Sequence, residues 1–345
     1  MSALTFQALR RLSDGRFHSG EEVARELGRS RATLSEALRI APDLGVDLFS
    51  VRGKGYKLAT PIEFIDVPRV RSAMGAGAKR IALEVVDEID STSTRLMERA
   101  TAGAPSGTCL AAEWQSAGRG RRGRTWVASL GGSLTFSLLW RFERGAGHLG
   151  GLSLAVGVAV ARALAACGVE RVQVKWPNDV VCDFRKIAGI LVETAGEMQG
   201  PSVAIIGAGI NYRLGERVVD RIDQPVTDVA QCSERLASRN EVLGKVLANM
   251  ATTLESFDRH GFTALRNAWR ELHAYQGKRV RVMFEGESNE SELLWQGRME
   301  TQAPDIDGCV LINDVPEDFA PRPGEMVNVL LTEALDYDML GRVVE

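Results

Sequence analysis

The sequence of 345 residues predicts an α+β fold in three parts. Residues 1–62 combine three short helical patterns with one strand–turn–strand pattern. In residues 80–272, apolar strand patterns alternate with helical ones, as in a mixed α/β domain with helices packed on a sheet. Residues 273–345 hold only short strand patterns between turns, which is typical of a small β-barrel.

Composition places the chain among ordinary globular proteins, with 45% hydrophobic and 25% charged residues and a net charge of −3. This balance gives no reason to expect a basic coat for nucleic acid or a membrane-binding surface. The five cysteines are scattered without paired spacing, and no histidine lies near them at ligand spacing. We therefore expect reduced thiols, a cytoplasmic location and no zinc site. The apolar run at 151–169 contains Arg162 and predicts a buried helix rather than a membrane span.

The first 62 residues have the pattern of a winged helix-turn-helix domain. Helical spacing in "TFQALRRLSDG" is followed by "SGEEVARELG", which starts with a serine cap and stops at a glycine. After a tight break comes "SRATLSEALRIA", and "VDLFSVRGKGYKL" then reads as a strand, a glycine turn and a strand. This order of elements predicts the winged helix-turn-helix.

The charge of this first domain favours DNA as its partner. Residues 1–60 hold ten basic and seven acidic residues, although the whole chain is negative. Basic side chains gather at the start of the third helix and at the hairpin tip, which is typical of a nucleic-acid footprint. A small helical module that binds protein is the alternative. The residues predicted to contact DNA are Ser30, Arg31, Thr33, Arg52 and Lys54.

The rest of the chain divides into a linker and two domains. We predict a linker over 63–79, a central domain over 80–272 and a barrel domain over 273–345. The central strands are expected at 80–89, 108–114, 132–141, 171–177, 186–195 and 202–212, with helices at 149–168 and 241–259. In the barrel domain, strands are expected at 277–286, 293–299, 308–314 and 326–333.

The stretch "GRGRRGRTW" at 118–126 matches G-x-G-x-x-G, a pattern known from dinucleotide-binding turns. Such a turn leads directly into a helix, whereas the following "TWVASLGGSLTFSLLW" is β-like and broken by glycines. Four arginines (119, 121, 122 and 124) between flexible glycines instead favour a loop that closes on a phosphate-bearing ligand and is mobile without it. A solvated surface loop is the alternative.

Two further clusters carry charge at strand ends. In "VKWPNDVV", a proline and an Asn-Asp pair predict a sharp turn that presents Lys175, Asn178 and Asp179. A lysine can neutralise phosphate, and a carboxylate can hold Mg²⁺ or accept a proton. In "FRKIAGILVE", Lys186 precedes an apolar strand in which Gly189 permits close backbone approach. A plain turn and a solvated lysine are the alternatives.

Two smaller clusters have less specific chemistry. The hydroxyl-rich "IDSTST" predicts a helix N-cap, and its side chains can serve as caps alone. The glycines of "GAGIN" at 207–211 would let a planar ligand lie against a strand, and tight strand packing is an equal explanation.

Taken together and in this order, these motifs resemble those of the biotin protein ligases, in particular the bifunctional kind that also represses a biotin operon. The motifs that carry the resemblance are "GRGRRGR", "KWPND", "RKIAGILVE" and "GAGIN", with the helical and hairpin patterns of the first domain. The resemblance covers nearly the whole chain. It implies a DNA-binding winged helix, a ligase domain and a small SH3-like barrel.

The resemblance implies an ATP-dependent ligase. Biotin would be converted to biotinyl-5′-AMP with release of pyrophosphate, and then transferred to a lysine of the biotin carboxyl carrier protein of acetyl-CoA carboxylase. It also implies Mg²⁺ as a cofactor, a homodimer on adenylate binding, and binding to operator DNA that represses biotin synthesis, with no membrane partner. Two alternatives are a ligand-sensing transcription regulator without turnover and a lipoate-type acyl ligase.

The resemblance also assigns site residues. The catalytic group is Lys186, Arg121 and Asp179, with Asp179 as the metal ligand. The expected biotin-binding residues are Ser91, Thr92, Ser93, Gln115, Arg119, Gly120, Arg121, Lys186, Gly189 and Gly207. The expected ATP- and adenylate-binding residues are Arg119, Arg121, Arg122, Lys175, Asn178 and Asn211.

The chain departs from the family pattern at four places. Ser93 stands where the family usually has asparagine, and "QPVTDVAQ" lacks an adenine-stacking tryptophan, so Pro225 or Val226 is expected in its place. In the third helix, Glu36 stands where a basic residue is common, and Pro42 falls where a helix usually continues. An acid facing phosphate would weaken DNA binding.

Overall fold

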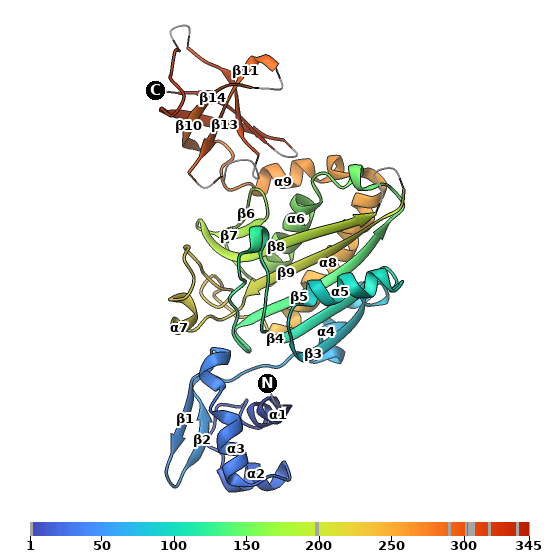
Figure 1. Ribbon diagram of the computed structural model, residues 1–345, viewed down its shortest axis with the longest axis vertical. Helices are drawn as coiled ribbons and strands as arrows, with labels where there is room; N and C mark the ends of the chain where they lie inside the picture. The colour runs from blue at the N-terminus through green and yellow to red at the C-terminus, as the bar shows by residue number, and fades with distance from the viewer. Residues whose placement is uncertain are drawn as a thin grey trace.

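The computed structural model describes residues 3–344 except 197–199, 289–290, 301, 303–307, 317–318 and 336–337. Three domains follow one another along the long axis of the molecule (Figure 1). The amino-terminal domain lies at one end, the central sheet in the middle and the barrel at the other end. This arrangement confirms the α+β fold class; the domain boundaries stay predictions.

The amino-terminal domain is a winged helix-turn-helix, as predicted. The Ser30 side chain caps the third helix by accepting a hydrogen bond from the Thr33 amide at 3.1 Å. That helix ends at Leu38, before the expected position, and a 3₁₀ turn follows with Pro42 in its first turn, where a missing N–H leaves no helical hydrogen bond unmade. The elements are α1 (Ala3–Arg11), α2 (Gly20–Glu26), α3 (Arg31–Leu38), η1 (Ala41–Leu44), β1 (Leu48–Val51) and β2 (Gly55–Leu58).

In the described part of the chain, the central sheet has seven strands in the order β3-β4-β5-β9-β8-β7-β6. Six of these strands lie where the sequence predicts them. The seventh, β7, is four residues long and follows the predicted Asn-Asp turn directly. The strands are β3 (Ala82–Ile89), β4 (Thr108–Gln115), β5 (Ser133–Phe142), β6 (Val172–Lys175), β7 (Asp179–Cys182), β8 (Arg185–Gly196) and β9 (Ser202–Asn211).

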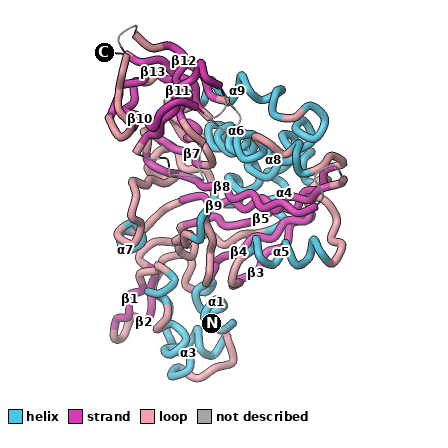
Figure 2. Tube along the Cα trace, turned by 45° about the horizontal axis from the view of Figure 1, so that its top comes forward, coloured by secondary structure: helices cyan, strands magenta, loops and turns pink. Residues whose placement is uncertain are grey.

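Helices cover both faces of this sheet, because neighbouring strand residues point to opposite sides. Leu138 and Ile206 belong to the main core beneath α6 and α8, whereas Leu139 and Ile205 pack under α5. Figure 2 shows α6 and α8 on one side of the strands and α5 on the other. The helices of the central part are α4 (Val67–Met74), α5 (Thr92–Thr101), α6 (Leu152–Ala166), α7 (Glu216–Val219), α8 (Arg239–His260) and α9 (Arg266–Leu272), with 3₁₀ turns η2 (Gly75–Lys79), η3 (Arg121–Gly123), η4 (Ala146–His148) and η5 (Phe262–Leu265).

Helix α6 is the apolar run that the sequence predicts to be buried, and 11 of its 15 residues are buried, between α8 and the sheet. Over the residues for which the structure is described, no helix has both the length and the apolar character that a membrane crossing requires.

The carboxyl-terminal domain is a closed barrel in the strand order β10-β11-β12-β14-β13. It is attached to the central domain at the end of β6. There the Ala274 amide donates to the Val174 carbonyl at 2.9 Å, one residue before Lys175. The neighbouring His273 stacks on Trp269, and burial lowers the pKa of this imidazole to about 4, so it is neutral at pH 7. The strands are β10 (Arg279–Ser288), β11 (Ser291–Met299), β12 (Val310–Asp314), β13 (Met326–Ala334) and β14 (Met339–Val343).

A fully buried ion pair ties the linker to the central domain. The Arg239 guanidinium donates to Glu113 at 2.6 Å, and both side chains are 0% exposed. Glu113 also accepts from the Ile65 amide at 2.6 Å, and Arg239 donates to the carbonyls of Glu63 and Ser133. One charge pair therefore joins the linker, β4, the start of β5 and the start of α8. Its hydrogen bonds offset the cost of burying both charges.

Candidate active site

A cavity of about 540 Å³ opens between the arginine loop and strands β4 to β9 of the central sheet. This volume is in the range of small-molecule sites. Each central-domain residue that we predict for biotin, ATP, metal or catalysis lines this cavity. They are Ser91, Thr92, Ser93, Gln115, Arg119, Gly120, Arg121, Arg122, Lys175, Asn178, Asp179, Lys186, Gly189, Gly207 and Asn211.

The floor of the cavity is a chain of buried hydroxyl groups. The Thr92 hydroxyl donates to the Gln115 side-chain oxygen at 3.0 Å, so it must accept from its other neighbour, Ser137, at 2.7 Å. Ser137 must then accept from Ser93, at 2.9 Å. All three protons are used along this chain, which leaves oxygen lone pairs to face a ligand. The floor therefore suits a ligand that offers N–H groups.

Three strand glycines make room above this floor. A Cβ atom on Gly209 would lie 2.3 Å from the indole of Trp126, and one on Gly189 would lie 3.0 Å from the same indole. A Cβ atom on Gly207 would meet the Ser93 hydroxyl at 2.7 Å. The planar group that lies against Gly209 of "GAGIN" is therefore the protein's own Trp126, whereas Gly207 makes room for the Ser93 hydroxyl. Its buried Nε1 makes no hydrogen bond to any part of the chain that the structure describes.

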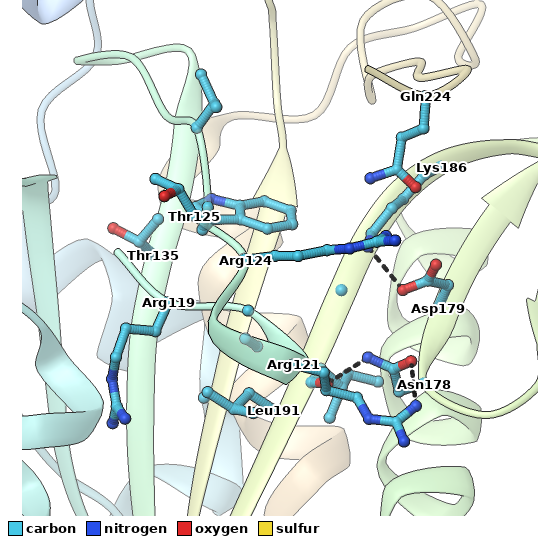
Figure 3. Close-up of a pocket in the computed structure, with 18 of the residues that line it drawn as sticks. Arg119, Arg121, Arg124, Thr125, Thr135, Asn178, Asp179, Lys186, Leu191 and Gln224 are labelled. Carbon is cyan, nitrogen blue, oxygen red and sulfur yellow. Dashed lines mark hydrogen bonds and ion pairs between the residues drawn. The ribbon is translucent and has the colours of Figure 1, made fainter. Parts of the chain in front are cut away.

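The opposite side of the cavity is charged. Lys186 Nζ lies 2.8 Å from the carboxylate of Asp179, and the two side chains are only 17% and 18% exposed. Arg121 donates to the Asn178 side-chain oxygen at 3.2 Å. Arg124 extends from the loop toward Lys186 and Asp179 (Figure 3). The predicted turn therefore brings Asn178 and Asp179 against both the loop and Lys186.

Arg119 has a different orientation from Arg124 (Figure 3). Its side chain points away from Lys186 and Asp179 (Figure 3) and donates to both carboxylate oxygens of Glu193, at 3.0 and 2.7 Å. The loop itself is a compact turn, in which Arg119 pairs with Thr125 and the Trp126 amide donates to the Gly118 carbonyl at 2.9 Å. Mobility of the loop without ligand stays a prediction.

A second segment, residues 221–226, covers the cavity beside Lys186. The Lys186 amide donates to the Pro225 carbonyl at 2.9 Å, and Val226 rather than Pro225 lines the cavity. The Asn211 side chain donates to the carbonyls of Lys186 and Thr227, so it holds this segment to the sheet.

The charge of the lining favours an anionic ligand. Among the described residues that line the cavity, seven are lysine or arginine and three are aspartate or glutamate. Cations held in a partly buried site stabilise phosphate charge more strongly than they would in water. In the described ranges, no group of three or more His, Cys, Asp or Glu side chains could hold a metal ion.

Several lining residues were missing from the sequence prediction. Arg124 and Trp126 lie inside the recognised loop. Ser137 is the last of three hydroxyl residues (133, 135 and 137) that alternate with apolar residues in β5, and this alternation is a usable signal. Gln224 begins the "QPVTDVAQ" stretch, in which only Pro225 or Val226 was expected to contact the ligand, and Glu300 comes from the barrel domain, in a segment without a motif. Such residues reach the site through tertiary packing alone.

Comparison with known proteins agrees with this geometry. Residues 85–211 match the Biotin/lipoate A/B protein ligase family, residues 5–57 an HTH domain and residues 277–344 a TRAM domain. The bifunctional ligase/repressor BirA of Salmonella typhimurium is 38% identical over 273 residues, which cover 79% of this chain and 83% of that protein. The chain belongs to the family of bifunctional biotin protein ligases.

Two other members of the biotin protein ligases extend the comparison. The biotin–[acetyl-CoA-carboxylase] ligase of Paracoccus denitrificans is 32% identical over 60% of this chain and 91% of that protein. The structure of the Aquifex aeolicus biotin protein ligase in complex with biotin and ATP is 28% identical, with a TM-score of 0.50 over 71% of this chain and 97% of that one.

Proposed function

We propose that this protein is an ATP-dependent biotin protein ligase that forms biotinyl-5′-AMP and transfers biotin to a lysine of the biotin carboxyl carrier protein of acetyl-CoA carboxylase. The observation that carries the proposal is the division of one cavity into two halves. A hydroxyl-lined floor that accepts N–H groups adjoins an edge of lysine and arginine side chains. Biotin offers ureido N–H groups at one end and a carboxylate at the other, so it can span both halves.

The biotin half comprises Ser91, Thr92, Ser93 and Gln115. Thr92 is held by Gln115 through both its amide and its hydroxyl, so the ring-binding groups are fixed before a ligand arrives. A fixed site avoids the entropy cost of ordering side chains on binding. Gly189, Gly207 and the loop at Arg119 and Gly120 form the walls.

The reaction takes place at the charged edge. In the first step, a biotin carboxylate oxygen forms a bond to the α-phosphorus of ATP and pyrophosphate leaves. Lys186 and Arg121 stabilise the negative charge that develops on the phosphate oxygens, and Arg122, Lys175, Asn178 and Asn211 orient the nucleotide. In the second step, the carrier lysine amine attacks the biotinyl carbonyl and AMP leaves. The arginine loop excludes water from the reactive anhydride.

Asp179 is our proposed ligand for Mg²⁺. A single carboxylate is enough, because Mg²⁺ is commonly held by one or two carboxylates together with substrate phosphates and waters. When bound, the ion would neutralise phosphate charge. The Lys186 ammonium, 2.8 Å away, holds this carboxylate at the phosphate edge.

The proposal is tested by pyrophosphate release. Incubation with ATP and Mg²⁺ should release pyrophosphate only when biotin is added, and biotinyl-5′-AMP should accumulate on the protein in the absence of a carrier. Lipoate should not replace biotin, because it has no N–H groups for the hydroxyl floor. Pyrophosphate release without biotin dependence would refute the ligase, and binding of biotin without product would favour a sensor without turnover.

We also propose that the amino-terminal domain binds operator DNA as a repressor of biotin synthesis. Ser30, Arg31 and Thr33 are exposed at the amino-terminal end of α3, and Arg52 and Lys54 are exposed at the hairpin tip. Glu36 is paired with Arg39 on the same helix, which reduces its repulsion of phosphate. A dimer formed on adenylate binding and a cytoplasmic location belong to this proposal.

DNA binding is expected to strengthen when biotinyl-5′-AMP is present. Arg31→Ala should weaken it and lower the slope of log K against log salt by about 1, as expected for loss of one phosphate contact. Gel shifts with DNA from upstream of biotin-synthesis genes measure this, with Arg162→Ala as the control, because Arg162 is exposed on α6 of the central domain. Absence of specific binding with the adenylate present would remove the repressor role.

A further inference from the structure

The amino-terminal domain is joined to the arginine loop through its hydrophobic core. Leu130, four residues after Trp126, is 3% exposed and belongs to the core cluster of the winged helix rather than to that of the central sheet. Its amide donates to the Leu44 carbonyl at 2.9 Å. Leu130 is therefore a central-domain residue whose side chain and backbone are both held by the DNA-binding domain.

The turn next to Leu44 contacts both segments that cover the cavity. Gly45 has a φ of 71°, and a Cβ atom there would lie 2.6 Å from Cβ of Ser129 and 3.0 Å from Val218. Ser129 lies three residues after Trp126, at the exit of the arginine loop. Val218 is buried in α7, and the chain continues from it through two hydrogen-bonded turns into segment 221–226.

Both cavity-covering segments thus end against one turn of the amino-terminal domain. A segment whose end is packed in a core has less conformational freedom than one that ends in solvent. We propose that Leu130 and Gly45 are positioning residues: through them the DNA-binding domain fixes the arginine loop and segment 221–226 over the cavity and slows release of the adenylate. The last part of this inference rests on the proposed function.

Two glycines allow a matched test. Gly45→Ala and Gly28→Ala both place a Cβ on a left-handed residue of the same domain, with φ of 71° and 63°. At Gly28, however, the new atom would meet nothing within 4 Å, whereas at Gly45 it meets Ser129. The difference between the two variants therefore separates the effect of the contacts with Ser129 and Val218 from the effect of the backbone strain.

Two readouts are measured on the full chain. Trypsin cleavage within the arginine loop of the ligand-free protein should become about tenfold faster in Gly45→Ala and change less than about twofold in Gly28→Ala. Release of pre-formed biotinyl-5′-AMP should accelerate in parallel, with KM for biotin and ATP rising while kcat of adenylation changes less than about threefold. Equal effects of the two variants would overturn the inference.

A second pair of variants keeps the inference testable if Gly45→Ala unfolds. Leu130→Ala and Leu34→Ala remove the same atoms from the same core, and both residues are nearly unexposed. Only Leu130→Ala should loosen the loop, although both should destabilise the domain. Similar loop cleavage in the two variants would overturn the inference. Because the trypsin measurement needs no ligand, it decides the inference even if the wild-type protein makes no adenylate.

Discussion

Lys186→Ala is expected to lower kcat/KM for biotin-dependent pyrophosphate release by about 10² to 10³, the usual loss for a group that stabilises transition-state charge. The variant loses the ammonium itself, and it also loses the 2.8 Å ion pair that holds the Asp179 carboxylate at the phosphate edge. Continuous pyrophosphate detection at saturating ATP measures the effect.

Lys79→Ala is the matched control, because Lys79 is exposed in η2, away from the cavity. It should keep full activity. A Lys186→Ala enzyme with wild-type turnover would refute the role assigned to Lys186.

Glu113→Ala should lower the free energy of unfolding by about 3 to 5 kcal/mol, because it leaves the buried Arg239 charge without its partner. The linker also loses the acceptor for the Ile65 amide. Chemical denaturation monitored by circular dichroism measures the change, provided that the transition of the central domain is resolved.

Two controls define the cause of that loss. Glu36→Ala breaks an exposed ion pair with Arg39 and should change stability by less than about 0.5 kcal/mol. The double variant Glu113→Leu/Arg239→Met replaces both charges by apolar groups and should cost less than either single change. A Glu113→Ala protein as stable as the wild type would contradict the importance of the pair.

Much of the fold was predictable because local signals agree with the final structure. Serine caps, glycine stops and the turn at Gly53 define the winged helix, and long apolar runs define the central strands. The two strands that escaped prediction, β7 and β14, are four and five residues long. Their existence depends on pairing with β8 and with β12 and β13, which short sequence patterns do not encode.

The site was predictable where chemistry is concentrated in a motif. Charged loops and turns are visible in the sequence, and every motif residue that we assigned to the site lines the cavity. The buried residues that support the site could not be predicted in this way. Arg239 and Glu113 are 126 positions apart in the chain, and each alone reads as an ordinary surface charge. Trp126 was not predicted as a site residue, because its position depends on Gly189 and Gly209, which are paired on the neighbouring strands β8 and β9 but lie far from Trp126 in the sequence.

The one-way order of the hydroxyl chain from Ser93 to Gln115 has a consequence for selectivity. A cyclic carbonate has nearly the outline of a urea ring, but it carries ring oxygens where the urea carries N–H groups. Its lone pairs would face the lone pairs of the floor, and the hydroxyls cannot turn to donate without breaking their own bonds. We therefore expect the site to discriminate between isosteres by the direction of their hydrogen bonds as well as by their shape.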